Sequence, residues 1–168
     1  MAKHFVPMAG LARRLIVALA LAAATLASGS SAEQMMVWTE NSSGGLTTLA
    51  YGPLDPGQAP LFMLSCFASL GIVVLDVHRE IPGAKPGDPL TIELSSDKAQ
   101  SPVTGEVGKD DAPGTTFGEA SNINVKPVLE VLRDPGPLTI KMGAASATLS
   151  ELGRAEAVAK FVDNCKLE

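Results

Sequence analysis

The residues best able to do chemistry lie around His78. Histidine is the side chain whose ordinary pKa lies nearest neutrality, so it is a common base or metal ligand. Asp76 precedes it by two residues, and in a strand both side chains would point to the same face. A carboxylate beside an imidazole can orient it for hydrolysis, or the pair can contribute to a metal site. Because one strand cannot complete a metal's ligand shell, the pattern also suits the polar face of an ordinary amphipathic strand.

Other reactive side chains give weaker patterns. Ser65 lies outside the Gly-x-Ser-x-Gly sequence of a hydrolase nucleophile, so a packing serine is the simpler interpretation. Thioethers and an imidazole suit Cu(I), but here these ligands are scattered along the chain. They are Met35, Met36, Met63, Met142 and His78. The sequence therefore predicts no catalytic residue, no metal and no cofactor.

The two cysteines, Cys66 and Cys165, favour a structural disulfide. An even number of cysteines is normally paired in an oxidising compartment, and two cysteines allow one pairing. The alternative is a redox or metal-binding thiol pair, but the chain has no Cys-x-x-Cys sequence. A bond closing a loop of about 100 residues stabilises a fold by about 4.7 kcal/mol in the chain-entropy model.

The N-terminal residues have the pattern of a secretory signal peptide. Basic residues precede an apolar run from Leu15 to Leu26, and small residues follow up to Ala32. The run is shorter than the about 20 residues that a membrane-spanning helix needs. We predict a signal peptide at 1–32 and one exported domain at 33–168, periplasmic or secreted, without a stable membrane anchor after cleavage. A pair of arginines leaves the general secretory and twin-arginine routes open.

The exported part alternates short apolar-polar stretches with turn residues, which predicts strands at regular spacing. We expect strands at 35–40, 46–51, 61–66, 72–79, 90–94, 103–107, 122–125, 138–142 and 145–149, and a polar loop at 109–116. A short helix is expected from Pro127 to Leu132. A C-terminal helix of about a dozen residues should follow Ser150 as N-cap, with Val158, Phe161, Val162 and Cys165 on its buried stripe.

These elements predict a mainly β fold, because no strand-helix-strand alternation is present. We expect an antiparallel β-sandwich or half-open barrel of about eight strands, with a short helix and a C-terminal helix. Trp38 and Tyr51 fall on the two strands of the first predicted hairpin. Exposed side by side, they would form a binding patch for a protein or glycan. The alternative is that both rings pack in the core.

Three stretches of the chain resemble those of known secreted proteins. Leu61–Cys66, the Pro-Gly-x-Pro-Leu-Thr-Ile segment at 86–92 and Phe161–Cys165 are similar to small uncharacterised secreted proteins of proteobacteria. The segment Leu138–Cys165 also resembles the C-terminal part of invasion-associated locus B proteins. The resemblance implies a secreted protein and carries no catalytic residue to this chain.

The charge balance narrows the range of partners. Residues 1–32 hold three of the 13 basic residues and none of the 18 acidic ones, so the exported domain is strongly acidic. Nucleic acids and anionic lipids bind basic surfaces, and we therefore predict no nucleic-acid partner. We expect a non-enzymatic periplasmic accessory or binding protein whose partner is another envelope protein or a glycan. The alternative is a metal-binding or hydrolytic protein that uses Asp76 and His78.

Overall fold

The described part of the chain is mainly β, as predicted. The structure is a computed structural model that describes residues 35–55, 57–109 and 116–167, so the predicted signal peptide lies outside it. Within these residues lie nine strands and two helices. They are β1 (Met36–Ser43), β2 (Leu46–Pro53), β3 (Phe62–Phe67), β4 (Ile72–Val77), β5 (Pro89–Ser95), β6 (Gln100–Lys109), β7 (Thr116–Ala120), α1 (Val125–Arg133), β8 (Leu138–Met142), β9 (Ala145–Leu149) and α2 (Arg154–Cys165).

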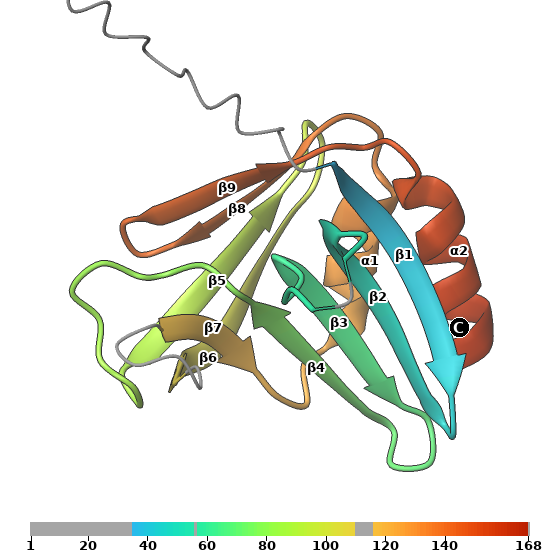
Figure 1. The fold of residues 1–168 in the computed structure, drawn as a ribbon, viewed down its shortest axis with the longest axis horizontal. Helices are drawn as coiled ribbons and strands as arrows, with labels where there is room; N and C mark the ends of the chain where they lie inside the picture. The colour runs from blue at the N-terminus through green and yellow to red at the C-terminus, as the bar shows by residue number, and fades with distance from the viewer. Residues whose placement is uncertain (1–34, 56, 110–115, 168) are drawn as a thin grey trace, which may run out of the picture. The chain divides into compact units, whose positions relative to one another are not determined.

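The strands form one open antiparallel sheet with the order β1-β2-β3-β4-β7-β6-β5-β8-β9. Strand β7 is the link between β1–β4 and the other four strands, as Figure 1 shows. It pairs with β4 over only three residues and with β6 over four. The arrangement is consistent with the predicted sandwich or half-open barrel, and both predicted helices are present.

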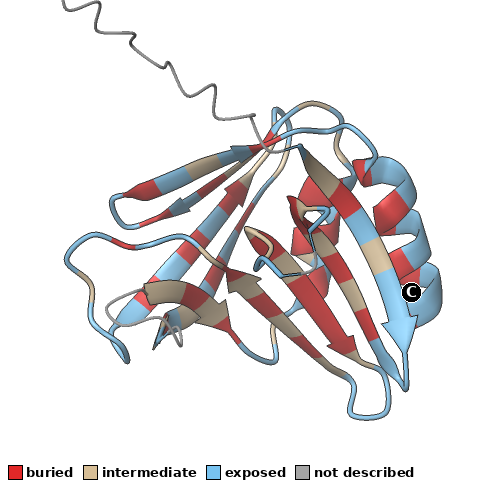
Figure 2. Ribbon diagram, viewed as in Figure 1, coloured by how far each residue is buried: buried red, intermediate tan, exposed pale blue. Residues whose placement is uncertain are grey.

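One face of the sheet, here called the inner face, carries the core. Leu49, Leu64 and Leu75 lie opposite one another on three neighbouring strands, and all are fully buried. Burial of such a side chain contributes about 1.5–3 kcal/mol. Helix α2 lies against β1 and β2, and α1 lies against β5, β6 and α2. Figure 2 shows buried and more exposed residues alternating along several strands, as expected for strands with one dry face.

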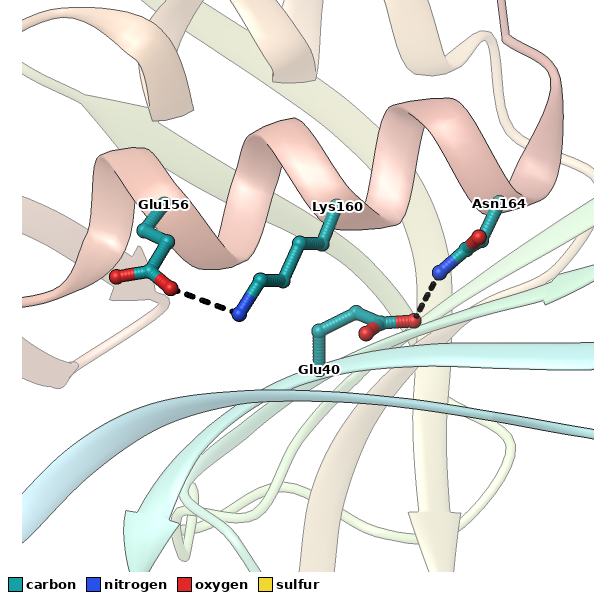
Figure 3. A network of polar contacts seen from close by, with 4 residues as sticks. All are labelled: Glu40, Glu156, Lys160 and Asn164. Carbon is teal, nitrogen blue, oxygen red and sulfur yellow. Dashed lines mark hydrogen bonds and ion pairs between the residues drawn. The ribbon is translucent and has the colours of Figure 1, made fainter.

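Helix α2 is attached to the sheet by a covalent bond and by polar contacts. The predicted Cys66–Cys165 disulfide is present, with the two Cα atoms 6.1 Å apart. Asn164 Nδ2 also donates to Glu40 Oε1 on β1 at 3.0 Å (Figure 3). Within the helix, Lys160 Nζ donates to Glu156 Oε1 at 2.7 Å, four residues away. The four predicted stripe residues of α2 are all buried.

The beginning of α2 differs from the prediction. The helix begins at Arg154, after Gly153 in the left-handed conformation, and Ser150 is not its N-cap. The Ser150 hydroxyl instead accepts from Leu152 N at 3.2 Å. The Arg154 guanidinium is buried, and its Nη2 donates to the carbonyls of Asp134 and Gly136. The helix begins late because this side chain fixes its first turn to the loop before β8.

The prediction of a strand at 122–125 is also wrong. Asn122 has a φ of 53°, which a strand does not allow, and Asn124 is the N-cap of α1, accepting from Lys126 N at 3.4 Å. The strand of this region is β7, which begins where a polar loop was predicted; most of that loop lies outside the described residues. Within the described residues, neither helix is long and apolar enough to cross a membrane.

Replacing both cysteines, Cys66→Ala with Cys165→Ala, should lower the free energy of unfolding by about 2–5 kcal/mol, because the bond restricts the unfolded chain. Urea unfolding of the oxidised wild type and the double variant measures the loss. Wild type treated with reductant should approach the variant. Equal stability of the oxidised wild type and the double variant would show that the bond does not hold α2 in place.

Candidate functional site

The predicted aromatic patch is not exposed. Trp38 and Tyr51 lie side by side as expected, with ring centroids 5.1 Å apart, but each is only 7% exposed. Trp38 Nε1 donates to Ser150 O at 2.6 Å, and the Tyr51 hydroxyl accepts from Ser150 N at 3.3 Å. Both side chains are therefore used to join the first hairpin to the residue that follows β9. Of the two alternatives, the structure shows the rings packed in the core, where their polar ends have internal partners.

Asp76 lies on the outer face of the sheet, away from Leu75 and the core. Its cross-strand neighbour on β7 is Glu119, and Glu119 lies opposite Glu106 on β6. Three carboxylates thus follow one row across three strands, and like charges directly opposite each other destabilise a sheet. Partial burial raises the pKa of Asp76 above its ordinary value, and the charge of Glu119 raises it further, while His78 lowers it in part.

His78 follows the last residue of β4 and packs against an aromatic ring. Its ring stacks on Phe117 of β7, with centroids 4.9 Å apart and an interplanar angle of 19°. Its Nδ1 is buried without a hydrogen-bond partner among the described residues. His78 and Asp76 are near enough to interact electrostatically, but no hydrogen bond between their side chains is found in the described part. The stacking on Phe117 covers one face of the imidazole at the surface of the sheet.

The remaining side chains considered for catalysis or metal binding do not lie together. Ser65 is buried in β3 opposite Thr48 and Val74, which have no acid-base chemistry. Met63 shares the outer row with Asp76, whereas Met142 is buried on the inner face beside Ile92. Across residues 35–55, 57–109 and 116–167, no three His, Cys, Asp or Glu side chains are grouped so that they could hold a metal ion.

A different part of the sheet has a hollow of about 470 Å³, here called the β6 groove. It runs along the first half of β6 and is bordered by the segment that joins β7 to α1 and by the first turn of α1. This volume lies within the about 300–1,000 Å³ of ordinary ligand pockets. The lining residues are Ser101, Pro102, Val103, Thr104, Ser121, Asn122, Ile123, Asn124 and Pro127.

The β6 groove exists because β7 is shorter than β6. Strand β7 pairs only with Glu106–Lys109, so residues 100–105 have no strand partner in it. Beyond β7 the chain stays attached to β4, since Ile123 N donates to Val73 O at 3.1 Å. The segment 121–124 therefore follows β4, and the space between it and β6 remains open.

The groove lining carries no charged side chain, although the chain as a whole is acidic. Five of its nine residues carry hydroxyl or amide groups. Three of the other four described hollows include charged side chains, whereas the one beside Asn164 does not, and Asp76 and His78 line none of the five. The groove can thus hold a ligand by neutral hydrogen bonds and apolar contacts, and offers no group for acid-base chemistry.

No family model, curated protein or solved structure matches this chain. The resemblance to invasion-associated locus B proteins therefore stays a prediction.

Sequence reasoning did not find the groove. Its residues come from β6 and from the Ser-Asn-Ile-Asn segment at 121–124, which overlaps the strand predicted at 122–125. Two asparagines around one apolar residue just before a helix are a turn and cap signal, because asparagine tolerates the left-handed conformation and caps helices. That signal could have predicted the turn before α1. The groove, however, also depends on the shortness of β7, which is set by its pairing with the distant strands β4 and β6.

We expect Asp76→Asn to stabilise the protein at pH 7 by about 0.5 kcal/mol, a modest value because the carboxyl is partly solvated. A raised pKa means that the folded state binds the proton on Asp76 more tightly than the unfolded chain does. Protonation therefore stabilises the folded wild type, fully below the ordinary pKa of 3.8. This stabilisation is lost as the pH rises through the pKa of the folded state. The gap between the proteins should therefore shrink toward pH 4. Urea unfolding from pH 4 to 8 measures it.

The control is Glu130→Gln, at an exposed position on α1, which should show no comparable gain. A loss of stability in Asp76→Asn at pH 7 would mean that a favourable contact holds the ionised carboxylate.

Proposed function

We propose that this chain is an exported, non-enzymatic binding protein of the cell envelope, and that it holds its partner in the β6 groove. The observation that carries the proposal is the groove itself, a hollow of about 470 Å³ with convergent uncharged polar groups. The disulfide supports an oxidising compartment, where such bonds form and persist. The partner is an envelope component, either a glycan or a protein.

The alternative role for Asp76 and His78 has less support. A catalytic or metal site needs several groups that converge on one hollow. Here the imidazole is stacked on Phe117, and the neighbouring carboxylates form a row along the sheet surface. We therefore assign these residues to the outer surface of the sheet rather than to the function.

Photo-crosslinking in bacterial cells that export the chain tests the role of the groove. Replacing Thr104 with p-benzoylphenylalanine places a reactive group in the lining, and the matched control is the same replacement at Thr148, an exposed position on β9. We expect adducts at position 104 and few at 148, and the same adducts when His78→Ala is added. Equal labelling at both positions, or loss of adducts with His78→Ala, would contradict the proposal. Mass spectrometry of the adduct identifies glycan or protein.

Export is tested by expressing the chain with its own N-terminal residues and sequencing the product. We expect the mature protein to begin at Glu33 and to be recovered in the periplasmic or culture fraction, because the sequence up to Ala32 has the order of a cleavable leader. Recovery of uncleaved protein in a membrane fraction would replace this prediction with a membrane-anchored form.

A further inference from the structure

We propose that the β6 groove binds a neutral carbohydrate, as a mono- or disaccharide unit of a larger glycan. This inference rests on the proposed function and adds the chemical class of the ligand. It is carried by three features of the groove, which are the blocked strand edge, the hydrogen-bonding capacity of the lining, and the apolar residues between the polar groups.

Residues 100–105 of β6 pair with β5 but have an open edge on the other side, and such an edge would ordinarily attract an extended peptide as a further strand. The direction of the main-chain groups follows from Val107, whose N–H donates to Asp88 O at 2.9 Å and whose carbonyl accepts from Gly87 N at 2.8 Å. Because main-chain groups alternate in direction along a strand, the N–H and C=O groups of the odd-numbered residues of β6 point toward β5. The N–H and C=O groups of the even-numbered residues then point toward the groove.

Pro102 is one of those even-numbered residues, and proline has no N–H to donate. It lies in the middle of the unpaired stretch, so a peptide strand added there would lack a ladder hydrogen bond at its centre. Proline at such a position is a common protection of strand edges against pairing. The groove edge therefore disfavours a peptide and leaves carbonyl groups that accept hydrogen bonds from hydroxyls.

The side chains of the lining suit the hydroxyl groups of a sugar. A sugar hydroxyl both donates and accepts, and the neutral side chains that do the same are hydroxyls and amides. Ser121 Oγ donates to Glu119 Oε1 at 3.3 Å, which leaves its oxygen as an acceptor toward the groove. Asn124 uses Oδ1 to cap α1, which leaves its NH₂ group as a donor. Thr104 and Asn122 add exposed groups of both kinds.

The groove also supplies apolar surface for the C–H face of a sugar ring. Pro102, Ile123 and Pro127 lie among its polar residues, and two of the three have rigid rings that lose little entropy when they contact a ligand. An anionic ligand would find no cationic side chain in the lining, and the neighbouring Glu119 carboxylate, which accepts from Ser121, is not among the lining residues. Charge thus selects a neutral ligand.

Titration of the ¹⁵N-labelled exported protein with maltose and with N,N′-diacetylchitobiose tests the inference. At least one sugar should give saturable amide shifts confined to residues 101, 103, 104 and 121–124. Thr104→Val and Asn122→Gly should each weaken that binding by about 2- to 10-fold, since each removes about one hydrogen bond. Glycine suits position 122 because the φ there is 53°, so the variant removes the amide without backbone strain.

The matched control is Thr148→Val on exposed β9, which removes a threonine hydroxyl outside the groove and should leave binding unchanged. A capped hexapeptide of Ala, Ser and Thr is the second probe. Shifts at the same amides with the peptide and with neither sugar would overturn the carbohydrate assignment and support the binding role. The absence of saturable shifts with either sugar overturns the assignment too, while cross-linking at position 104 tests the binding role separately.

Discussion

The bond between Cys66 and Cys165 joins helix α2 covalently to strand β3, 99 residues earlier in the chain, and so ties that helix to the sheet whose apolar face it helps to cover. A single open sheet of nine strands has one long apolar face, and helices of only nine and 12 residues cover it. Such short helices are marginal by themselves. The disulfide, the Asn164 contact with Glu40 and the packing of Phe161 together hold α2 where the β1 end of the sheet would otherwise be open.

The short strand β7 has two opposite effects on the sheet. It joins the two halves through few register pairs, and its Glu119 has acidic neighbours on both sides, so the joint carries unfavourable charge. Gly118 allows the backbone to pass close to the inner side chains, because a Cβ there would collide with Met142. The same shortness leaves residues 100–105 of β6 without a partner on the β7 side and opens the groove. The candidate site thus lies where the sheet itself is least continuous.

The sequence predicts the local parts of this fold well. Alternation located the strands from β1 to β6 and both strands of the last hairpin, and the spacing of Val158, Phe161 and Cys165 gave the buried stripe of α2. The sequence did not decide some features that depend on residues far away in the chain. The burial of Trp38 requires Ser150, 112 residues away, and the start of α2 depends on what Arg154 contacts. The groove was not predictable, because it arises from a pairing that ends early rather than from a motif.

The position of Cys165 has a consequence for the order in which the protein assembles. A chain that leaves a ribosome or a translocation channel emerges N-terminus first, so Cys66 and the strands around it appear long before the residue they bond. During that interval strands β1 and β2, with Leu49, are without the helix that lies against them, and exposed apolar strands of this kind tend to associate. The waiting thiol must also remain unreacted with other cysteines. The native state is therefore reached only after emergence of residues 154–165, and until then the incomplete chain carries apolar strands that α2 does not yet cover.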